Sequence, residues 1–286
     1  MRRPTRVGKG ACLVANPFSI PECYHPAMSK DVLIEARGLM KEYGTGRRVV
    51  DGVSFVIKRG ETLGLVGESG SGKSTVARML LRLVAPTSGE VQYAGQDLLA
   101  MGPRKMRAMR RRMQIVFQDP YAALNPRMRV REILAEPFAI HRQSLEDQQT
   151  RLSAMLRGVG MDESALERFP HEFSGGQRQR INIARSLALK PEFLVLDEPV
   201  SALDVSVGAQ VVNLLRELQR EYGLPYLFIS HSMPLVRYLC DRVAVMERGK
   251  LVELGECEQV CDAPQEEYTR KLIAATPEMP ISLEDG

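Results

Sequence analysis

Short apolar runs alternate with amphipathic segments along most of the chain. Runs of about five residues are typical of buried strands rather than helices. Such runs begin at Thr62, Gln114, Phe193 and Tyr226. Apolar residues at helical spacing follow, as over residues 207–218, where a helix is expected to end at Gly223. This alternation predicts an α/β chain around a largely parallel sheet.

Three regions depart from this alternation. Val53, Phe55 and Ile57 occupy alternate positions, which predicts an early antiparallel strand. Residues 243–253 are expected to form a late hairpin that turns at Arg248-Gly249. Between residues 119 and 169 strand patterns are absent and helical periodicity dominates.

The first 28 residues carry four prolines and little periodicity, so we expect a disordered extension, with Met28 as a candidate start. The basic residues at the beginning are not followed by an apolar core, which argues against a signal peptide. No apolar run approaches the ~20 residues that span a bilayer. The length of 286 residues suffices for one large domain or two small ones.

A glycine-rich loop lies between the predicted strand at Thr62 and a predicted helix. Its spacing is G-x-x-x-x-G-K-S, the phosphate-binding pattern, in which backbone N–H groups close around phosphate oxygens. Lys73 would add a charge for the outer phosphates, and the Ser74 hydroxyl would ligate Mg²⁺. The motif predicts nucleoside triphosphate binding, which kinases, GTPases and transport ATPases share. The candidate binding residues are Gly67, Glu68, Ser69, Gly70, Ser71, Gly72, Lys73, Ser74 and Thr75.

The apolar run at Phe193 ends in two carboxylates, Asp197 and Glu198. Ligands bind at the carboxyl ends of buried parallel strands, so Asp197 is placed to hold Mg²⁺, through water. Glu198 would polarise the attacking water. Two solvated acids at a strand end are the alternative interpretation, but the phosphate loop upstream favours catalysis.

Residues 173–180, F-S-G-G-Q-R-Q-R, open a predicted helix just before this acidic strand. Ser174 is a suitable N-cap, and Lys190-Pro191 would stop the helix. Adjacent glycines at a helix N-terminus, Gly175 and Gly176, predict a second anion site.

Together these motifs resemble the ATPase subunits of ABC transporters, over about residues 32–277. Ser174, Gly175, Gly176 and Gln177 look like the family signature, with Phe173 where leucine is commonest. The remaining matches are Gln118 as the Q-loop glutamine, Ser201 to Asp204 as the D-loop, His231 as the switch histidine and Tyr43 as the aromatic residue that stacks on adenine.

The resemblance implies a P-loop NTPase core with a mixed, largely parallel sheet, an antiparallel β subdomain and a helical subdomain. The ATPase domain would cover residues 29–265, with the helical subdomain at 119–169 and a short tail at 266–286. The implied catalytic residues are Glu198, His231, Lys73 and Gln118, the implied metal ligands are Ser74, Gln118 and Asp197, and Asp204 joins the nucleotide-binding set.

The same resemblance implies that ATP is sandwiched between two ATPase subunits, identical or paralogous, so that the signature acts across the interface. Two membrane permease subunits would bind this pair at the cytoplasmic face of the cell membrane. An extracytoplasmic solute-binding protein would be an indirect partner. No nucleic-acid partner is implied.

Residues 117–128 resemble the oligopeptide, dipeptide and nickel importer branch, as do residues 198–206 and 268–272. Import of di- or oligopeptides is therefore the expected function. Ser232 departs from that branch, which usually has an aspartate after the histidine. The chain also stops soon after Pro277, which argues against the iron–sulfur site of some relatives.

Two alternatives stay open at this point. One is a non-transport ABC protein that acts on ribosomes or DNA, although the chain has one cassette and no long coiled coil. The other is a soluble P-loop kinase, which would not need Ser174 to Gln177. Co-purification with permease subunits would separate all three.

The cysteines and the net charge change this interpretation little. Cys257 and Cys261 are the only close pair among five cysteines, and no histidine lies near them, so reduced structural thiols are favoured over a metal site. The net charge is +4, and the densest basic run is residues 105–112. This run is compatible with contacts to nucleic acid or lipid phosphate, but a solvated helix face is favoured.

Overall fold

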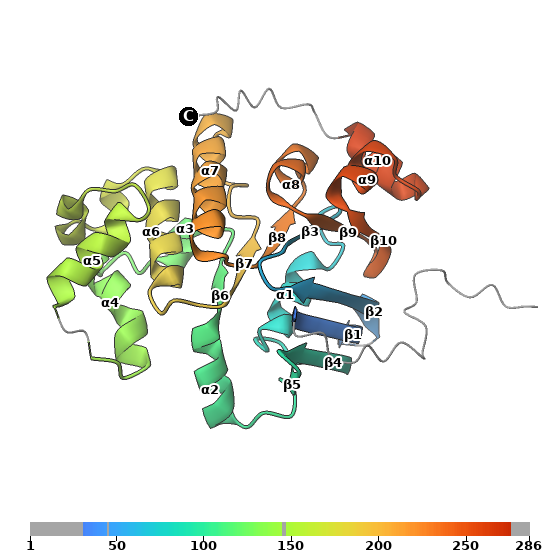
Figure 1. The fold of residues 1–286 in the computed structure, drawn as a ribbon, viewed down its shortest axis with the longest axis horizontal. Helices are drawn as coiled ribbons and strands as arrows, with labels where there is room; N and C mark the ends of the chain where they lie inside the picture. The colour runs from blue at the N-terminus through green and yellow to red at the C-terminus, as the bar shows by residue number, and fades with distance from the viewer. Residues whose placement is uncertain (1–30, 45, 145–146, 276–286) are drawn as a thin grey trace, which may run out of the picture.

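A computed structural model describes residues 31–44, 46–144 and 147–275, and it contains two sheets with helices around them (Figure 1). The larger sheet has the strand order β10-β9-β3-β8-β7-β6, and the smaller has the order β2-β1-β4-β5. The strands are β1 Val32–Tyr43, β2 Arg47–Lys58, β3 Thr62–Val66, β4 Ser88–Tyr93, β5 Gln96–Asp97, β6 Met113–Val116, β7 Phe193–Asp197, β8 Tyr226–Ser230, β9 Arg242–Glu247 and β10 Lys250–Glu256.

The centre of the larger sheet is parallel, as the sequence predicts. Every residue of β3, β7 and β8 is buried, because helices cover both faces of these strands. β8 pairs in parallel with both β3 and β7, and β6 extends the sheet beyond β7. β9 and β10 form the predicted hairpin at the other edge, with the turn at Arg248-Gly249.

The smaller sheet is antiparallel, and β2 carries the alternating residues that predicted it. Val53, Phe55 and Ile57 are buried on one face. They belong to a core that also includes side chains of α1 and β3, so this sheet is packed onto the phosphate-loop region.

The helices gather partly on the parallel sheet and partly in a separate group at one end of the molecule (Figure 1). They are α1 Lys73–Leu80, α2 Pro103–Arg112, α3 Pro120–Ala123, α4 Val130–Ile140, α5 Gln148–Arg157, α6 Gly175–Leu187, α7 Val205–Tyr222, α8 Met233–Leu239, α9 Cys257–Asp262 and α10 Glu267–Ala275, with 3₁₀ turns at Glu163–Glu167 and Pro170–Glu172. α7 ends before Gly223, whose φ of 58° is left-handed, as predicted.

The helical group contains more of the chain than the strand-free residues 119–169. α6 packs against α3, α4 and α5, so the helix that begins at the signature residues belongs to this group. The reason is that its apolar stripe, which includes Ile181, Ile183 and Ala184, joins the core that these helices share.

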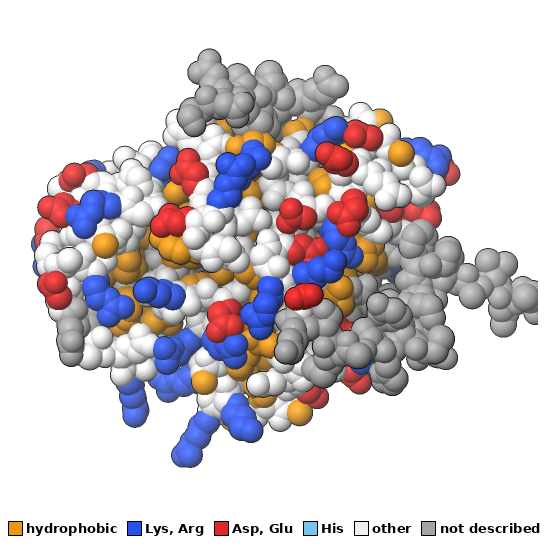
Figure 2. Space-filling model, in the orientation of Figure 1, with side chains coloured by type: hydrophobic (Ala, Val, Ile, Leu, Met, Phe, Trp, Pro, Cys, Tyr) orange, Lys and Arg blue, Asp and Glu red, His pale blue; other side chains and the backbone are white. Residues whose placement is uncertain are grey.

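The basic run forms the solvated face of α2, as favoured from the sequence. Met106 and Met109 are buried, whereas Lys105, Arg107 and Arg110 are exposed. Lys and Arg side chains accordingly gather at the α2 end of the molecule in Figure 2.

The structure describes none of the predicted N-terminal extension and only part of the predicted C-terminal tail. The expected extension at residues 1–28 lies outside the described residues, as does the end of the chain after Ala275. The first part of the predicted tail is helix α10, which the sequence analysis did not identify. Within the described ranges, none of the helices has the length and apolarity needed to cross a membrane.

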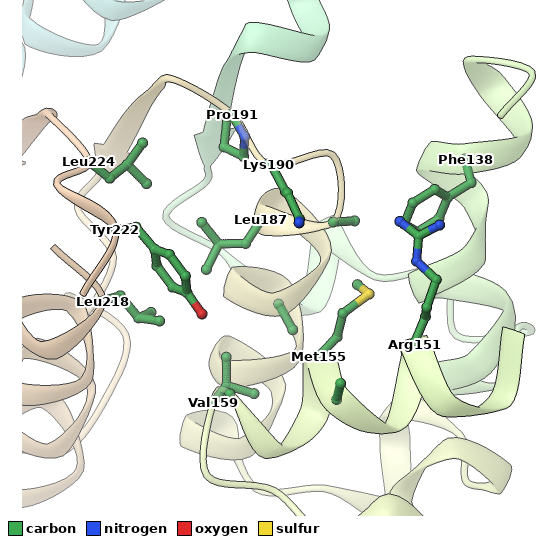
Figure 3. Close-up of a pocket in the computed structure, with 14 residues that line it drawn as sticks. Phe138, Arg151, Met155, Val159, Leu187, Lys190, Pro191, Leu218, Tyr222 and Leu224 are labelled. Carbon is green, nitrogen blue, oxygen red and sulfur yellow. The ribbon is translucent and has the colours of Figure 1, made fainter. Parts of the chain in front are cut away.

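A pocket of about 480 Å³ lies where α4, α5 and α6 approach the end of α7 (Figure 3). Its walls are mostly apolar, and the guanidinium group of Arg151 lies 4.8 Å from the centre of the Phe138 ring. None of the predicted site residues lines it, so this pocket is separate from the predicted nucleotide site.

Candidate nucleotide site

The phosphate loop connects β3 to α1, and two of its glycines are required by the neighbouring backbone. A Cβ atom at Gly67 would lie 2.2 Å from the carbonyl oxygen of Met246 in β9. One at Gly72 would lie 2.5 Å from the carbonyl oxygen of Val49 in β2. Both glycines also have positive φ, of 146° and 107°. The loop is therefore clamped between strands of both sheets.

Lys73 begins α1 and is buried inside this loop. Its Nζ donates hydrogen bonds to the carbonyl oxygens of Gly67 and Glu68, both at 2.7 Å. Burial lowers the pKa of Lys73, while the carboxylates of Glu198 and Asp197 act in the opposite direction. The loop thus holds a buried ammonium group beside the point where the phosphates of a nucleotide would lie.

Ser74 and Asp197 come from α1 and the end of β7, and they meet directly. Ser74 Oγ donates to Asp197 Oδ1 at 2.8 Å. Burial raises the pKa of Asp197, and the hydrogen bond from Ser74 opposes this effect. A hydroxyl and a carboxylate oxygen this close are ligands of the kind that Mg²⁺ prefers, so the residues present fit a magnesium ion.

Glu198 follows β7 but points to a different set of partners, as expected for adjacent residues at a strand end. Its Oε2 accepts a hydrogen bond from Gln118 Nε2 at 3.3 Å and lies 3.5 Å from His231 Nδ1. Its φ of 48° is unusual for a residue other than glycine. Glu198 thus has hydrogen-bond partners distinct from those of Asp197, although its carboxylate lines the same pocket as Ser74.

Of the groups just described, Lys73, Ser74, Gln118, Glu198 and His231 line one pocket of about 620 Å³, within the size range of small-molecule sites. It brings together residues separated by more than 180 positions, from Val49 to His231. Its lining residues are Val49, Ser69, Gly70, Gly72, Lys73, Ser74, Thr75, Gln118, Glu198, Ser201 and His231.

Several predicted residues are not among those lining this pocket: Asp197, which contacts Ser74, Gly67, Glu68 and Ser71 of the loop itself, and three further elements, Tyr43, the signature residues and Asp204. Tyr43, at the end of β1, is 44% exposed. Ser174 caps α6 by accepting a hydrogen bond from the Gln177 N–H, and the N-terminus of α6 faces the D-loop, because a Cβ at Gly175 would lie 3.1 Å from Leu203. Asp204 precedes α7 and lines a neighbouring pocket, together with Glu198 and His231.

Tyr268 is a contact to the phosphate loop that sequence analysis missed. Its hydroxyl, on α10, accepts a hydrogen bond from the Glu68 N–H at 3.2 Å. The N-terminus of α10 is held by buried Glu253, which accepts hydrogen bonds from the N–H groups of Gln265 and Glu266. Tyr268 lies in the segment that resembles the importer branch, but the sequence gives no sign that this segment returns to the loop.

We expect Tyr268→Phe to raise the KM for ATP about twofold to tenfold, since one hydrogen bond contributes about 0.5–1.5 kcal/mol. The ring and its packing are kept, so the melting temperature should stay near that of the wild type. Steady-state ATPase kinetics would measure the change. Tyr238→Phe is the matched control, because its hydroxyl bonds Asn213 away from the pocket. Equal KM values in the two variants would contradict a role for Tyr268.

Comparison with known proteins agrees with this geometry. The model of the family described as ABC transporter matches residues 50–201. The chain belongs to the ABC transporter family. This ABC protein is 49% identical over 251 residues to the oligopeptide transport ATP-binding protein OppF of Bacillus subtilis, with 86% of the chain and 82% of the relative covered.

Two solved structures share the fold of this ABC protein at 28% identity. One is cbiO1 from Clostridium perfringens, part of the ABC transporter complex cbiONQ, with a TM-score of 0.73 over 80% of this chain and 90% of that one. The other is a dimeric post-hydrolysis state of the ATP-binding cassette MJ0796 bound to ADP and Pi, with a TM-score of 0.70 over 79% and 99%. The predicted family and the predicted fold class, an ABC ATPase, are both confirmed.

Proposed function

We propose that this ABC protein is the ATP-hydrolysing subunit of a peptide importer, with MgATP as its nucleotide. The observation that carries the proposal is the single pocket that joins the phosphate loop to Glu198 and His231. The similarity to an oligopeptide transport ATP-binding protein over most of the chain supports the choice of peptides.

The chemistry is attack of water on the γ-phosphate. Lys73 and the N–H groups of the loop bind the phosphate oxygens, and Ser74 and Asp197 would hold Mg²⁺, which would offset the charge that develops on the phosphates. Glu198 orients the water and accepts its proton. Gln118 and His231 contact the Glu198 carboxylate, which fixes its direction. With ATP bound, His231 would also contact the γ-phosphate.

The signature residues complete the site from a second ATPase subunit. Ser174, Gly175, Gly176 and Gln177 start α6 outside the pocket that contains their own phosphate loop. The N-terminus of α6 offers N–H groups to an anion, and this end carries no acidic residue in its first turn. ATP bound between two subunits then acts as a ligand of the dimer, and hydrolysis releases it.

We expect Ser174→Arg to prevent ATP-dependent dimerisation while nucleotide affinity of the monomer changes less than about threefold. The long side chain would occupy the approach to the N-terminus of α6, whereas the phosphate loop is untouched. Light scattering with and without ATP would measure the dimer. Ser164→Arg is a matched control, on an exposed 3₁₀ turn of the same helical group. ATP-dependent dimerisation of Ser174→Arg like that of the control would show that Ser174 is only a helix cap.

Two permease subunits would bind this pair at the cytoplasmic face of the membrane, and a solute-binding protein would deliver the peptide. Deleting the gene is expected to reduce uptake of a radiolabelled di- or oligopeptide by more than about tenfold, in a strain without a redundant system. Complementation with the wild type should restore uptake, and complementation with Glu198→Gln should not. Normal peptide uptake in the deletion strain would overturn the assignment of peptides as the transported solute. The assignment of ATP hydrolysis would be tested separately, by measuring ATP turnover of the purified complex.

A further inference from the structure

Two thiols that the nucleotide chemistry does not use lie together on α9. Cys257 and Cys261 are four residues apart on this helix, and their Sγ atoms are 3.9 Å apart, within hydrogen-bond distance for sulfur. Residues four apart face the same side of a helix, which explains the contact. A pair of thiols in mutual contact differs from a lone cysteine, because each sulfur has a partner with which it can react.

The two thiols have different surroundings. Cys257 is 5% exposed, and its Sγ lies 3.7 Å from the carbonyl oxygen of Val236 on α8. Cys261 is half-buried and reachable by a small solute. The hydrogen bond from Cys257 lowers the pKa of the Cys261 thiol, and the Arg237 guanidinium acts in the same direction, against the effect of burial. Cys261 is thus the more accessible member of the pair and the one whose thiol pKa is lowered, and Cys257 is the shielded member.

The backbone permits a bond between the two sulfurs. Helix geometry places Cα atoms four residues apart at about 6.2 Å. Disulfides occur with Cα separations of about 4.4–6.8 Å, but also with Cβ separations of about 3.5–4.5 Å, shorter than the about 5–6 Å between Cβ atoms four residues apart on a helix. Closure therefore needs the six-residue helix α9 to unwind locally as the two side chains rotate. The two Sγ atoms are already in contact, and the short helix that carries them directly follows β10.

We propose that Cys257 and Cys261 form a peroxide-oxidisable dithiol that closes to a reversible intrahelical disulfide. The Cys261 thiolate attacks one peroxide oxygen, the O–O bond breaks, and a sulfenic acid forms while hydroxide leaves. The hydrogen bond to Cys261 and burial raise the pKa of the Cys257 thiol, but its sulfur is already 3.9 Å from that of Cys261. The Cys257 thiol therefore attacks the sulfenic sulfur as it gives up its proton, the S–S bond forms, the S–O bond breaks, and the oxygen leaves as water with that proton. Both thiols are oxidised by two electrons in total, and one hydroperoxide is reduced. A dithiol reductant reverses the reaction by exchange.

Cys240 provides an internal comparison. It is 8% exposed, and burial raises the pKa of its thiol well above the ordinary value. A buried thiol that stays protonated is a poor nucleophile, so Cys240 should be inert under the same conditions. If peroxide oxidises Cys261 but not Cys240, the cause is therefore the surroundings of Cys261 on α9. A general sensitivity of the protein's thiols to peroxide would affect both residues.

The test is peptide mapping of the full chain after a short treatment with one equivalent of hydrogen peroxide, followed by alkylation of the free thiols. We expect the Cys257–Cys261 peptide to lose two hydrogen atoms and to resist alkylation until dithiothreitol is added, while Cys240 is alkylated only after denaturation. In Cys257→Ser, the sulfenic acid on Cys261 should persist and be trapped by dimedone. In Cys261→Ser, neither the disulfide nor the trapped adduct should form on α9.

Other outcomes would overturn the proposal. Alkylation of both α9 thiols at the untreated rate would show that the pair is not oxidised. Conversion of Cys261 to sulfinic acid in the wild type, without the disulfide, would show that Cys257 does not resolve it. Circular dichroism of each serine variant guards against misfolding, and the wild-type map alone decides whether the disulfide forms.

Discussion

Glu198→Gln is expected to lower the ATPase turnover number about 10³-fold while the affinity for MgATP changes less than about threefold. A positioned general base contributes about 10²–10⁴-fold, and an amide of nearly the same shape cannot accept the proton. The side-chain oxygen can still accept the hydrogen bond that Gln118 donates to Glu198, so the shape of the pocket should be kept. Ser74, Asp197 and Lys73 are unchanged, which preserves binding of the nucleotide.

Single-turnover hydrolysis and equilibrium nucleotide binding would separate these two effects. Glu192→Gln is the matched control, because Glu192 precedes the same strand β7 at its other end and contacts Arg112 and Tyr93 instead of the pocket. This variant should keep turnover within about twofold. If the purified Glu198→Gln protein hydrolysed ATP within tenfold of the wild type, Glu198 would not be the base. The loss of hydrolysis should also trap the ATP-bound dimer, since ATP would then stay at the interface.

The nucleotide pocket could be predicted from the sequence because its parts obey local rules. The phosphate loop is continuous in sequence, and Asp197 and Glu198 follow a short buried strand. In a parallel sheet the carboxyl ends of β3, β7 and β8 reach one edge, so Lys73, Glu198 and His231 had to converge there once the strands were identified. Strand direction explains why these residues converge, but His231 and Gln118 were singled out only by the resemblance to ABC transporter ATPases.

Other features depend on packing that leaves no local pattern. Tyr268 reaches Glu68 across 200 residues, and only the position of α10 determines this contact. The hydrophobic stripe of α6 showed a helix but not its neighbours, so the extent of the helical group was not predictable. The pair Cys257 and Cys261 was visible as a spacing, but the contact between the sulfurs depends on residues 257–262 being helical.

Whether the signature residues 174–177 form part of the nucleotide site could not be decided from the sequence. Residues 174–177 look like an anion site in the sequence, and the structure does form a capped helix there. A single chain nevertheless keeps this helix end out of its own nucleotide pocket. The sequence pattern of an N-cap is the same whether the helix end is exposed to solvent or contacts a second subunit. The pattern at residues 174–177 therefore does not by itself predict the dimer of ATPase subunits.

Lys73→Ala is expected to lower the affinity for ATP by about 10–100-fold and to reduce turnover by more than about 10³-fold. The ammonium group is buried, and its hydrogen bonds to Gly67 and Glu68 hold it within the loop that would surround the phosphates. A charge in such a desolvated position interacts strongly with a phosphate, so its removal costs more than loss of a surface cation. Lys73→Arg should not rescue turnover, because a planar guanidinium cannot occupy the same buried position.

Calorimetric titration with a slowly hydrolysed ATP analogue would measure the binding loss, and phosphate release would measure turnover. Lys250→Ala is the matched control, since this lysine lies on β10 with its side chain 66% exposed and 3.5 Å from Asp51. Exposed pairs of this kind contribute about 0–1 kcal/mol, so the control should bind ATP like the wild type. Turnover of Lys73→Ala close to that of Lys250→Ala would refute the assignment of the pocket as the hydrolytic site, because no other described lysine lines it.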